Sequence, residues 1–143
     1  MADYKKILLV VDLSDDSQVI GERAKAIAAC YQSQITLLHV VEYVPVEPMG
    51  EALLPTVQIE GELVERARSR LAELADRLSL KQSQQLIETG GIKTEIIRTA
   101  QRLGVDLIVL GSRERHGLAI LLNFTEDTIL HAAPCDVLAV RLH

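Results

Sequence analysis

The chain has 143 residues, of which 48% are hydrophobic and 24% charged, with a formal net charge of −5 and a pI of about 5.3. This length fits one domain, 1–143, with a sizeable core. The acidic balance argues against nucleic acid or an anionic membrane as the main partner, because both favour a basic surface. No apolar run approaches the roughly 20 residues of a membrane span, and the first residues lack a signal peptide's layout, so we expect a cytoplasmic protein.

Cysteines and aromatic residues are few. Cys30 and Cys135 lie far apart without metal-ligand spacing, so we expect two reduced, buried thiols and no metal site. Aromatic residues make up 3% of the chain and tryptophan is absent, which argues against a base-stacking surface.

The first elements predict a strand, a helix and a second strand. Residues 6–12 are almost continuously apolar, as in a strand covered on both faces, and end in Asp12. Residues 14–16 supply oxygen acceptors for a helix start, and an apolar stripe continues through Tyr31. Residues 34–42 are the second strand.

The segment 43–59 is predicted to be irregular. It holds Pro45, Pro48, Pro55 and Gly50, and loops of this length are binding loops, lids or plain surface connections. After it, an apolar stripe from Val64 to Leu78 predicts a helix, and residues 86–87 predict a short outer strand.

The last third alternates in the same way. A Gly90-Gly91 turn leads into a helix that places Ile96, Ala100 and Leu103 inward and ends at Gly104. A strand over 105–110 breaks at Gly111. A helix is expected from Asn123 to His131, and a final strand over 136–141.

The order of elements is βαβαβαβαβ. It predicts an α/β fold with a five-stranded, parallel, doubly wound sheet, helices on both faces and right-handed crossovers. The strand order 3-2-1-4-5 would place the first strand beside the fourth, at the switch point where such sheets bind ligands. Asp12 and the loop after Gly111 would then face each other.

That loop carries the best candidates for binding an anion: Arg113, Arg115 and His116. Glu114 lies among them and would repel the anion or pair with an arginine. An exposed loop of mixed charge is the competing interpretation. Asp12 could bind ribose hydroxyls or a metal, or could favour the following helix start.

Motifs for catalysis are lacking. The chain contains no G-x-S-x-G, H-E-x-x-H, P-loop or G-x-G-x-x-G, and no nucleophile with a recognisable base, so enzyme chemistry has no positive support. A phospho-accepting receiver would need an acidic pair at the end of the first strand and a lysine after the last one. Neither is present.

The last strand predicts an interface. If it lies at the edge of the sheet, its unpaired backbone invites an identical strand from a second subunit. We therefore expect a homodimer through Asp136, Val137, Leu138, Ala139, Val140 and Arg141. A monomer that covers this edge with its own loops is the alternative.

Four segments together resemble the universal stress proteins, in particular the small single-domain bacterial type. These segments are residues 6–14, 37–42, 105–113 and 131–140, and they occur in that family's order. The resemblance implies a Rossmann-like fold, a cytoplasmic location, dimers through the last strand and a role in stress survival. It also implies that Asp12 and Val40 match ribose- and adenine-contacting positions of ATP-binding members.

The resemblance fails at the family's ATP signature. Many members carry glycine, two residues, glycine, nine residues, then glycine and serine or threonine. Here Gly111 and Thr125 match, but Glu114 and Phe124 replace the second and third glycines. A carboxylate and a bulky ring oppose a triphosphate by like charge and by steric filling.

Two functions follow as expectations. The first is a non-enzymatic stress-response dimer that binds no ATP or other cofactor and acts through protein partners. The second is a nucleotide sensor that holds ATP with magnesium through Asp12, Val40, Gly111, Arg113, Arg115 and Thr125, with weak hydrolysis at most.

Overall fold

The structure is a computed structural model, and it describes residues 3–42, 53–113, 129 and 131–142. Five strands form one parallel sheet in the order β3-β2-β1-β4-β5, as the sequence predicts. The strands are β1 (Lys6–Val10), β2 (Gln34–Val41), β3 (Gln84–Thr89), β4 (Leu107–Arg113) and β5 (Asp136–Leu142).

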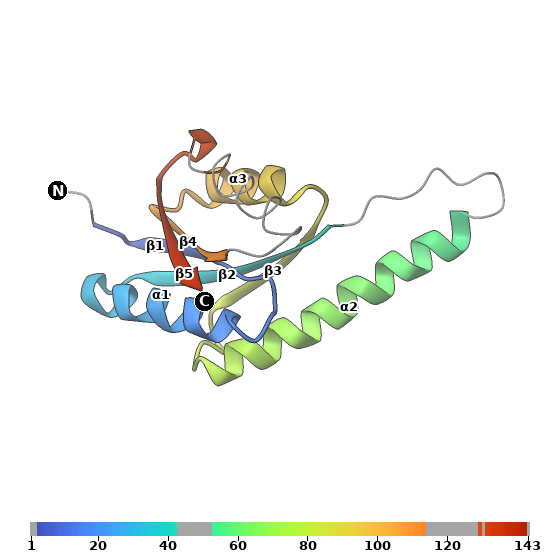
Figure 1. The fold of residues 1–143 in the computed structure, drawn as a ribbon, viewed down its shortest axis with the longest axis horizontal. Coiled ribbons are helices and arrows are strands. Elements are labelled where there is room, and N and C mark those ends of the chain that lie inside the picture. Colours follow the sequence, from blue (N-terminus) through green and yellow to red (C-terminus); the bar gives the residue numbers. More distant parts are fainter. Residues whose placement is uncertain (1–2, 43–52, 114–128, 130, 143) are drawn as a thin grey trace.

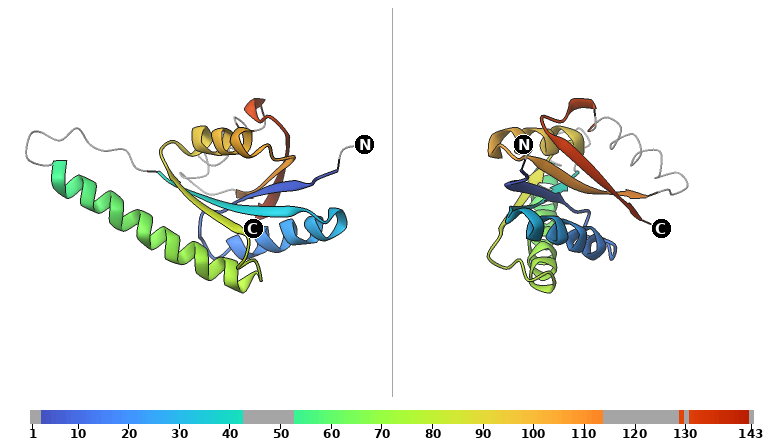
Figure 2. Two further views of the ribbon diagram at one scale, coloured as in Figure 1. Left: turned by 180° about the vertical axis from the view of Figure 1, so that it is seen from behind. Right: turned by 90° about the vertical axis from the view of Figure 1, so that its left-hand side faces the viewer.

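Helices cover both faces of this sheet (Figures 1 and 2). On one face lie α1 (Ser17–Tyr31) and α2 (Leu53–Arg77), and on the other lies α3 (Ile92–Leu103). The amino-terminal end of α2 extends beyond the sheet (Figure 1). Each crossover returns the chain to a parallel strand, which is why every strand's carboxyl end points to the same edge.

Alternate residues of the strands pack into two separate cores. Ile7 and Leu9 of β1 join the core beneath α1 and α2, while Leu8 joins the core beneath α3 with Ile96 and Ala100. All five are buried. Because a strand covered on both faces has no solvated side, the apolar runs of the sequence lack the polar alternation of a surface strand.

The prediction that residues 43–59 are irregular is wrong for residues 53–59, because α2 begins at Leu53. Pro55 is compatible with this early start: the first backbone N–H groups of a helix have no partner within it, so a proline removes no bond there. Residues 43–52 lie outside the described residues.

The fourth strand also differs from the prediction, since it does not break at Gly111. The β4 ladder continues through Gly111, Ser112 and Arg113, which pair with the residues of β5 from Val140 to Leu142. Gly104 ends α3 in a left-handed conformation with φ 63°, as predicted, and residues 105–106 form the connection rather than the start of the strand.

Two smaller predictions have mixed outcomes. β3 is a short outer strand as expected, with six residues that include the predicted Leu86 and Ile87. Cys30 is exposed and Cys135 only partly buried, so the expectation of two buried thiols is wrong. Partial burial raises the pKa of the Cys135 thiol. Of the predicted helix 123–131, Ile129 and His131 are described, and both are helical.

Candidate functional site

The carboxyl ends of β1 and β4 meet at the switch point of the sheet. Leu9 of β1 lies opposite Val109 of β4, so the segments that follow both strands start at the same level. In the sheet, β2 lies on the other side of β1 and β5 lies on the other side of β4, so the strand order runs in opposite directions from this point. This arrangement forms the crevice in which doubly wound folds bind ligands.

Asp12 lies two residues beyond the end of β1, at this crevice. One of its carboxylate oxygens, Oδ1, accepts hydrogen bonds from the Ser14 backbone N–H at 2.9 Å and from the Ser17 hydroxyl at 3.1 Å. The Asp12 side chain thereby joins the end of β1 to the start of α1. Of the alternative roles that the sequence leaves open for Asp12, the structure shows the one at the helix start.

The backbone around Asp12 is held by two side chains from other elements. His39 Nδ1 of β2 lies 2.8 Å from the carbonyl oxygen of Val11, and Arg70 Nη2 of α2 donates a hydrogen bond to the carbonyl oxygen of Leu13. In the sequence, His39 lies within the predicted second strand with no Cys or His nearby at ligand spacing, which predicts a structural role, and this contact agrees with that role. It gives no signal for Arg70, whose place next to the apolar stripe of α2 looks like that of any surface arginine.

Val40 is buried in the core beneath α3, with 7% of its surface exposed. Leu38 and Ile96 belong to the same core. The side chain is therefore explained by packing alone.

Gly111 is also explained by packing. A Cβ atom at this position would lie 2.6 Å from Ile20 Cδ1 and 2.9 Å from Leu142 Cδ1. Glycine thus allows α1 and the end of β5 to approach β4 closely. This requirement exists whether or not a phosphate group binds nearby.

The remaining candidates fall at the limit of the described chain. Arg113 is the last residue of β4, paired with Leu142 through the backbone. Arg115, His116 and Thr125 lie outside the described residues, as do Glu114 and Phe124. The structure therefore brings together Asp12, Val40 and Gly111 at one edge of the sheet, and these three all have roles within the fold.

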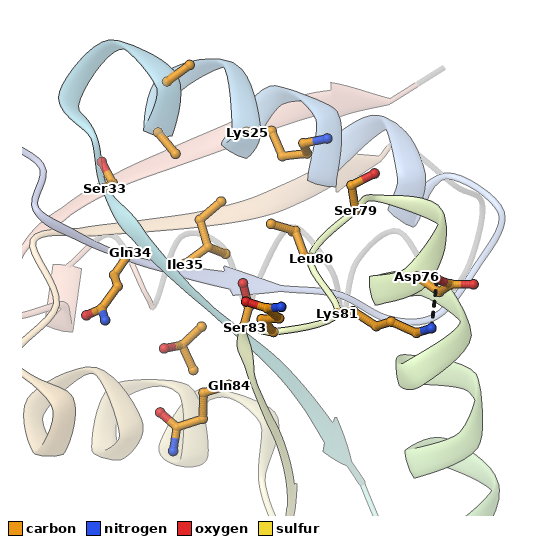
Figure 3. Close-up of a pocket in the computed structure, with 14 residues that line it drawn as sticks. Lys25, Ser33, Gln34, Ile35, Asp76, Ser79, Leu80, Lys81, Ser83 and Gln84 are labelled. Atoms are coloured by element: carbon orange, nitrogen blue, oxygen red, sulfur yellow. Dashed lines mark ion pairs between the residues drawn. The ribbon is translucent and has the colours of Figure 1, made fainter.

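A different cavity, of about 750 Å³, opens at the amino ends of β2 and β3 (Figure 3). Lys25 of α1 borders it on one side, and the turn from Ser79 to Gln84 borders it on the other. Lys81 pairs there with Asp76 at 3.7 Å, between exposed side chains. Because the strands are parallel, this cavity lies at the edge of the sheet opposite the crevice.

Within the described ranges, no group of three or more histidine, cysteine or acidic side chains could hold a metal ion. Among the helices of those ranges, none is long and apolar enough to cross a membrane.

Comparison with known proteins identifies the family. The model of the universal stress protein family matches residues 3–141. Universal stress protein A homolog 2 of Coxiella burnetii is 38% identical over 143 residues, covering 99% of this chain and 98% of that protein. Homolog 1 of the same organism is 39% identical, covering 96% of each.

Solved structures show the same fold. The universal stress protein UspA from Lactobacillus plantarum superposes with a TM-score of 0.76 at 27% identity, over 99% of this chain and 100% of that one. A universal stress protein in complex with cAMP superposes with a TM-score of 0.71 at 19% identity, over 97% and 98%. The sheet order, the four sequence segments and these matches agree: this chain belongs to the universal stress protein family.

Proposed function

We propose that this chain is a universal stress protein that does not hold ATP, catalyses no reaction and acts in the cytoplasm as a homodimer through protein partners. The observation that carries the proposal is the replacement of two signature glycines by Glu114 and Phe124. Bare backbone N–H groups are what a phosphate chain needs at such a loop. A carboxylate repels that chain, and a phenyl ring fills its space.

The geometry of the crevice supports this proposal. Asp12, Val40 and Gly111 match nucleotide-contacting positions of the family, and each is needed by the fold itself: Asp12 at the start of α1, Val40 in the core and Gly111 against Ile20. Their presence therefore does not require a nucleotide.

Restoring the signature tests the proposal. The double variant Glu114→Gly, Phe124→Gly is expected to gain ATP affinity, measured by calorimetric titration with ATP and magnesium, whereas the unchanged protein is expected to show no binding heat. The matched control Glu114→Gln, Phe124→Leu removes the charge and the ring without supplying glycines. It is expected to bind no ATP, because glutamine and leucine leave less room than glycine for phosphate oxygens to approach backbone N–H groups. A double-glycine variant with no affinity would contradict the crowding explanation.

A nucleotide sensor is the second candidate, favoured by the structural neighbour that is in complex with cAMP. In this function Asp12 would bind a ribose, while Arg113, Arg115 and Thr125 would hold phosphate oxygens in place of glycine backbone. The same titration with cAMP separates the two candidates. Binding that weakens in Arg113→Ala supports the sensor, and no binding heat supports the first proposal.

The dimer is proposed to form through β5. Among the strands that the structure describes, β5 pairs with β4 alone, so its other side is an edge of the described sheet. Residues 136, 139 and 141 are exposed, which leaves the edge accessible to a second copy.

A further inference from the structure

The segment from Asp12 to Ser17 carries two unfavourable features. Leu13 has φ 64°, in the left-handed region that side chains with a Cβ rarely adopt, although its side chain is buried. The hydroxyl oxygen of Ser14 is buried and has no hydrogen-bond partner among the described residues. A conformation with such features persists only where surrounding contacts hold it.

The contacts that hold it are made to the two carbonyl groups on either side of Asp12. A carbonyl oxygen can only accept, so His39 Nδ1 carries the proton that it donates to Val11. Arg70 donates to the carbonyl of Leu13 from 57 positions further along the chain. Its guanidinium is charged, which makes this bond stronger than one between neutral groups.

The backbone at Arg70 is held in place by buried neighbours on α2. The residues of α2 around it, Ala67, Leu71 and Leu74, are buried in the core beneath the sheet. The backbone that carries the guanidinium is therefore anchored, although the side chain lies at the surface.

We propose that Arg70 and His39 are positioning residues of the crevice. They hold the two carbonyls that flank Asp12 and so keep the Asp12 carboxylate on the Ser14 N–H and the Ser17 hydroxyl. The orientation of Asp12 thereby depends on α2, an element that supplies none of the other residues named at the crevice. The inference rests on the proposed function only in treating the crevice as the site, and it holds for either candidate function.

The test measures amide hydrogen exchange by NMR on the full chain without any ligand. In Arg70→Met, the Ser14 amide is expected to exchange about tenfold faster or more, because a hydrogen bond from a charged donor is worth at least that factor. The Ala24 amide, in the middle of α1, is expected to keep its rate. Arg70→Lys still offers a charged donor and is expected to recover part of the loss.

Arg77→Met is the matched control. Arg77 lies on the same helix, two turns further on, and borders the same cavity of about 200 Å³ beside Leu13 and Ser14. In the described part of the chain it makes no hydrogen bond or ion pair. Equal exchange at Ser14 in the Arg70 and Arg77 variants, or a uniform acceleration that includes Ala24, would overturn the proposal. Nucleotide titrations play no part in this outcome, so a failure of this proposal can be told apart from a failure of the proposed function.

Discussion

At the residue scale, Gly111 and Gly61 differ in the space around them. Gly111 lies in a regular strand, and its importance comes from the side chains of Ile20 and Leu142 that approach it. Packing alone therefore explains a glycine at this position of the signature. The same residue type at Gly61, in the middle of α2, has no atom within 4 Å of a would-be Cβ.

These two positions give opposite expectations for alanine. Gly111→Ala is expected to lower the free energy of unfolding by about 1–3 kcal/mol, the usual cost of an overpacked core. Gly61→Ala is expected to raise it by about 0.5–1 kcal/mol, because alanine is the better helix former. Urea unfolding of both variants checks this pair. A Gly111→Ala protein as stable as the parent would show that the crevice can relax around an added methyl group.

The contact made by Arg70 could not be predicted from the sequence. The apolar stripe of α2 predicts which of its residues are buried, and Leu71 and Leu74 are. The hydrogen bond from Arg70 to the Leu13 carbonyl joins segments that only the folded chain brings together. No local sequence pattern therefore predicts it. The left-handed conformation of Leu13 is not predicted by the sequence either, because that conformation favours glycine and the residue here is leucine.

At the element scale, the order of strands and helices follows from hydrophobic runs and turn residues. The residues at which the elements begin and end are predicted less well. β4 continues past Gly111 because β5 offers it a ladder as far as Leu142, and that partner is not visible in the β4 sequence alone. Likewise α2 begins at Leu53 although Pro55 suggests an irregular segment, because proline disrupts only the interior of a helix.

The proposed dimer can be tested on β5 with two adjacent proline variants. Successive N–H groups of a strand point to opposite sides, so one of positions 138 and 139 faces β4 and the other faces the open edge. Leu138→Pro and Ala139→Pro are therefore expected to differ. The one that faces β4 lowers the stability of the fold, and the other weakens association while the fold stays intact.

Sedimentation equilibrium together with thermal unfolding reads out both effects. The dimer proposal requires that one of the two variants be a folded monomer under conditions in which the parent is a dimer. A parent protein that sediments as a monomer, or two folded variants that remain dimeric, would contradict pairing through β5.

At the scale of the whole molecule, the chain has the fold of the universal stress proteins and matches their family model over residues 3–141. The five-stranded order and the helices on both faces match the sequence prediction. Asp12, Val40 and Gly111 have roles in the fold, and the residues that would crowd a triphosphate, Glu114 and Phe124, follow β4 in the sequence and lie outside the described residues. The proposed function therefore depends on whether this part of the chain admits ATP.

Thermal and chemical unfolding of the parent protein with increasing ATP and magnesium tests this directly. A ligand that binds only the folded state adds about 2.7 kcal/mol of stability at about 100 times its dissociation constant. The account predicts no change in the free energy of unfolding up to millimolar ATP. A saturable rise toward that value would contradict it.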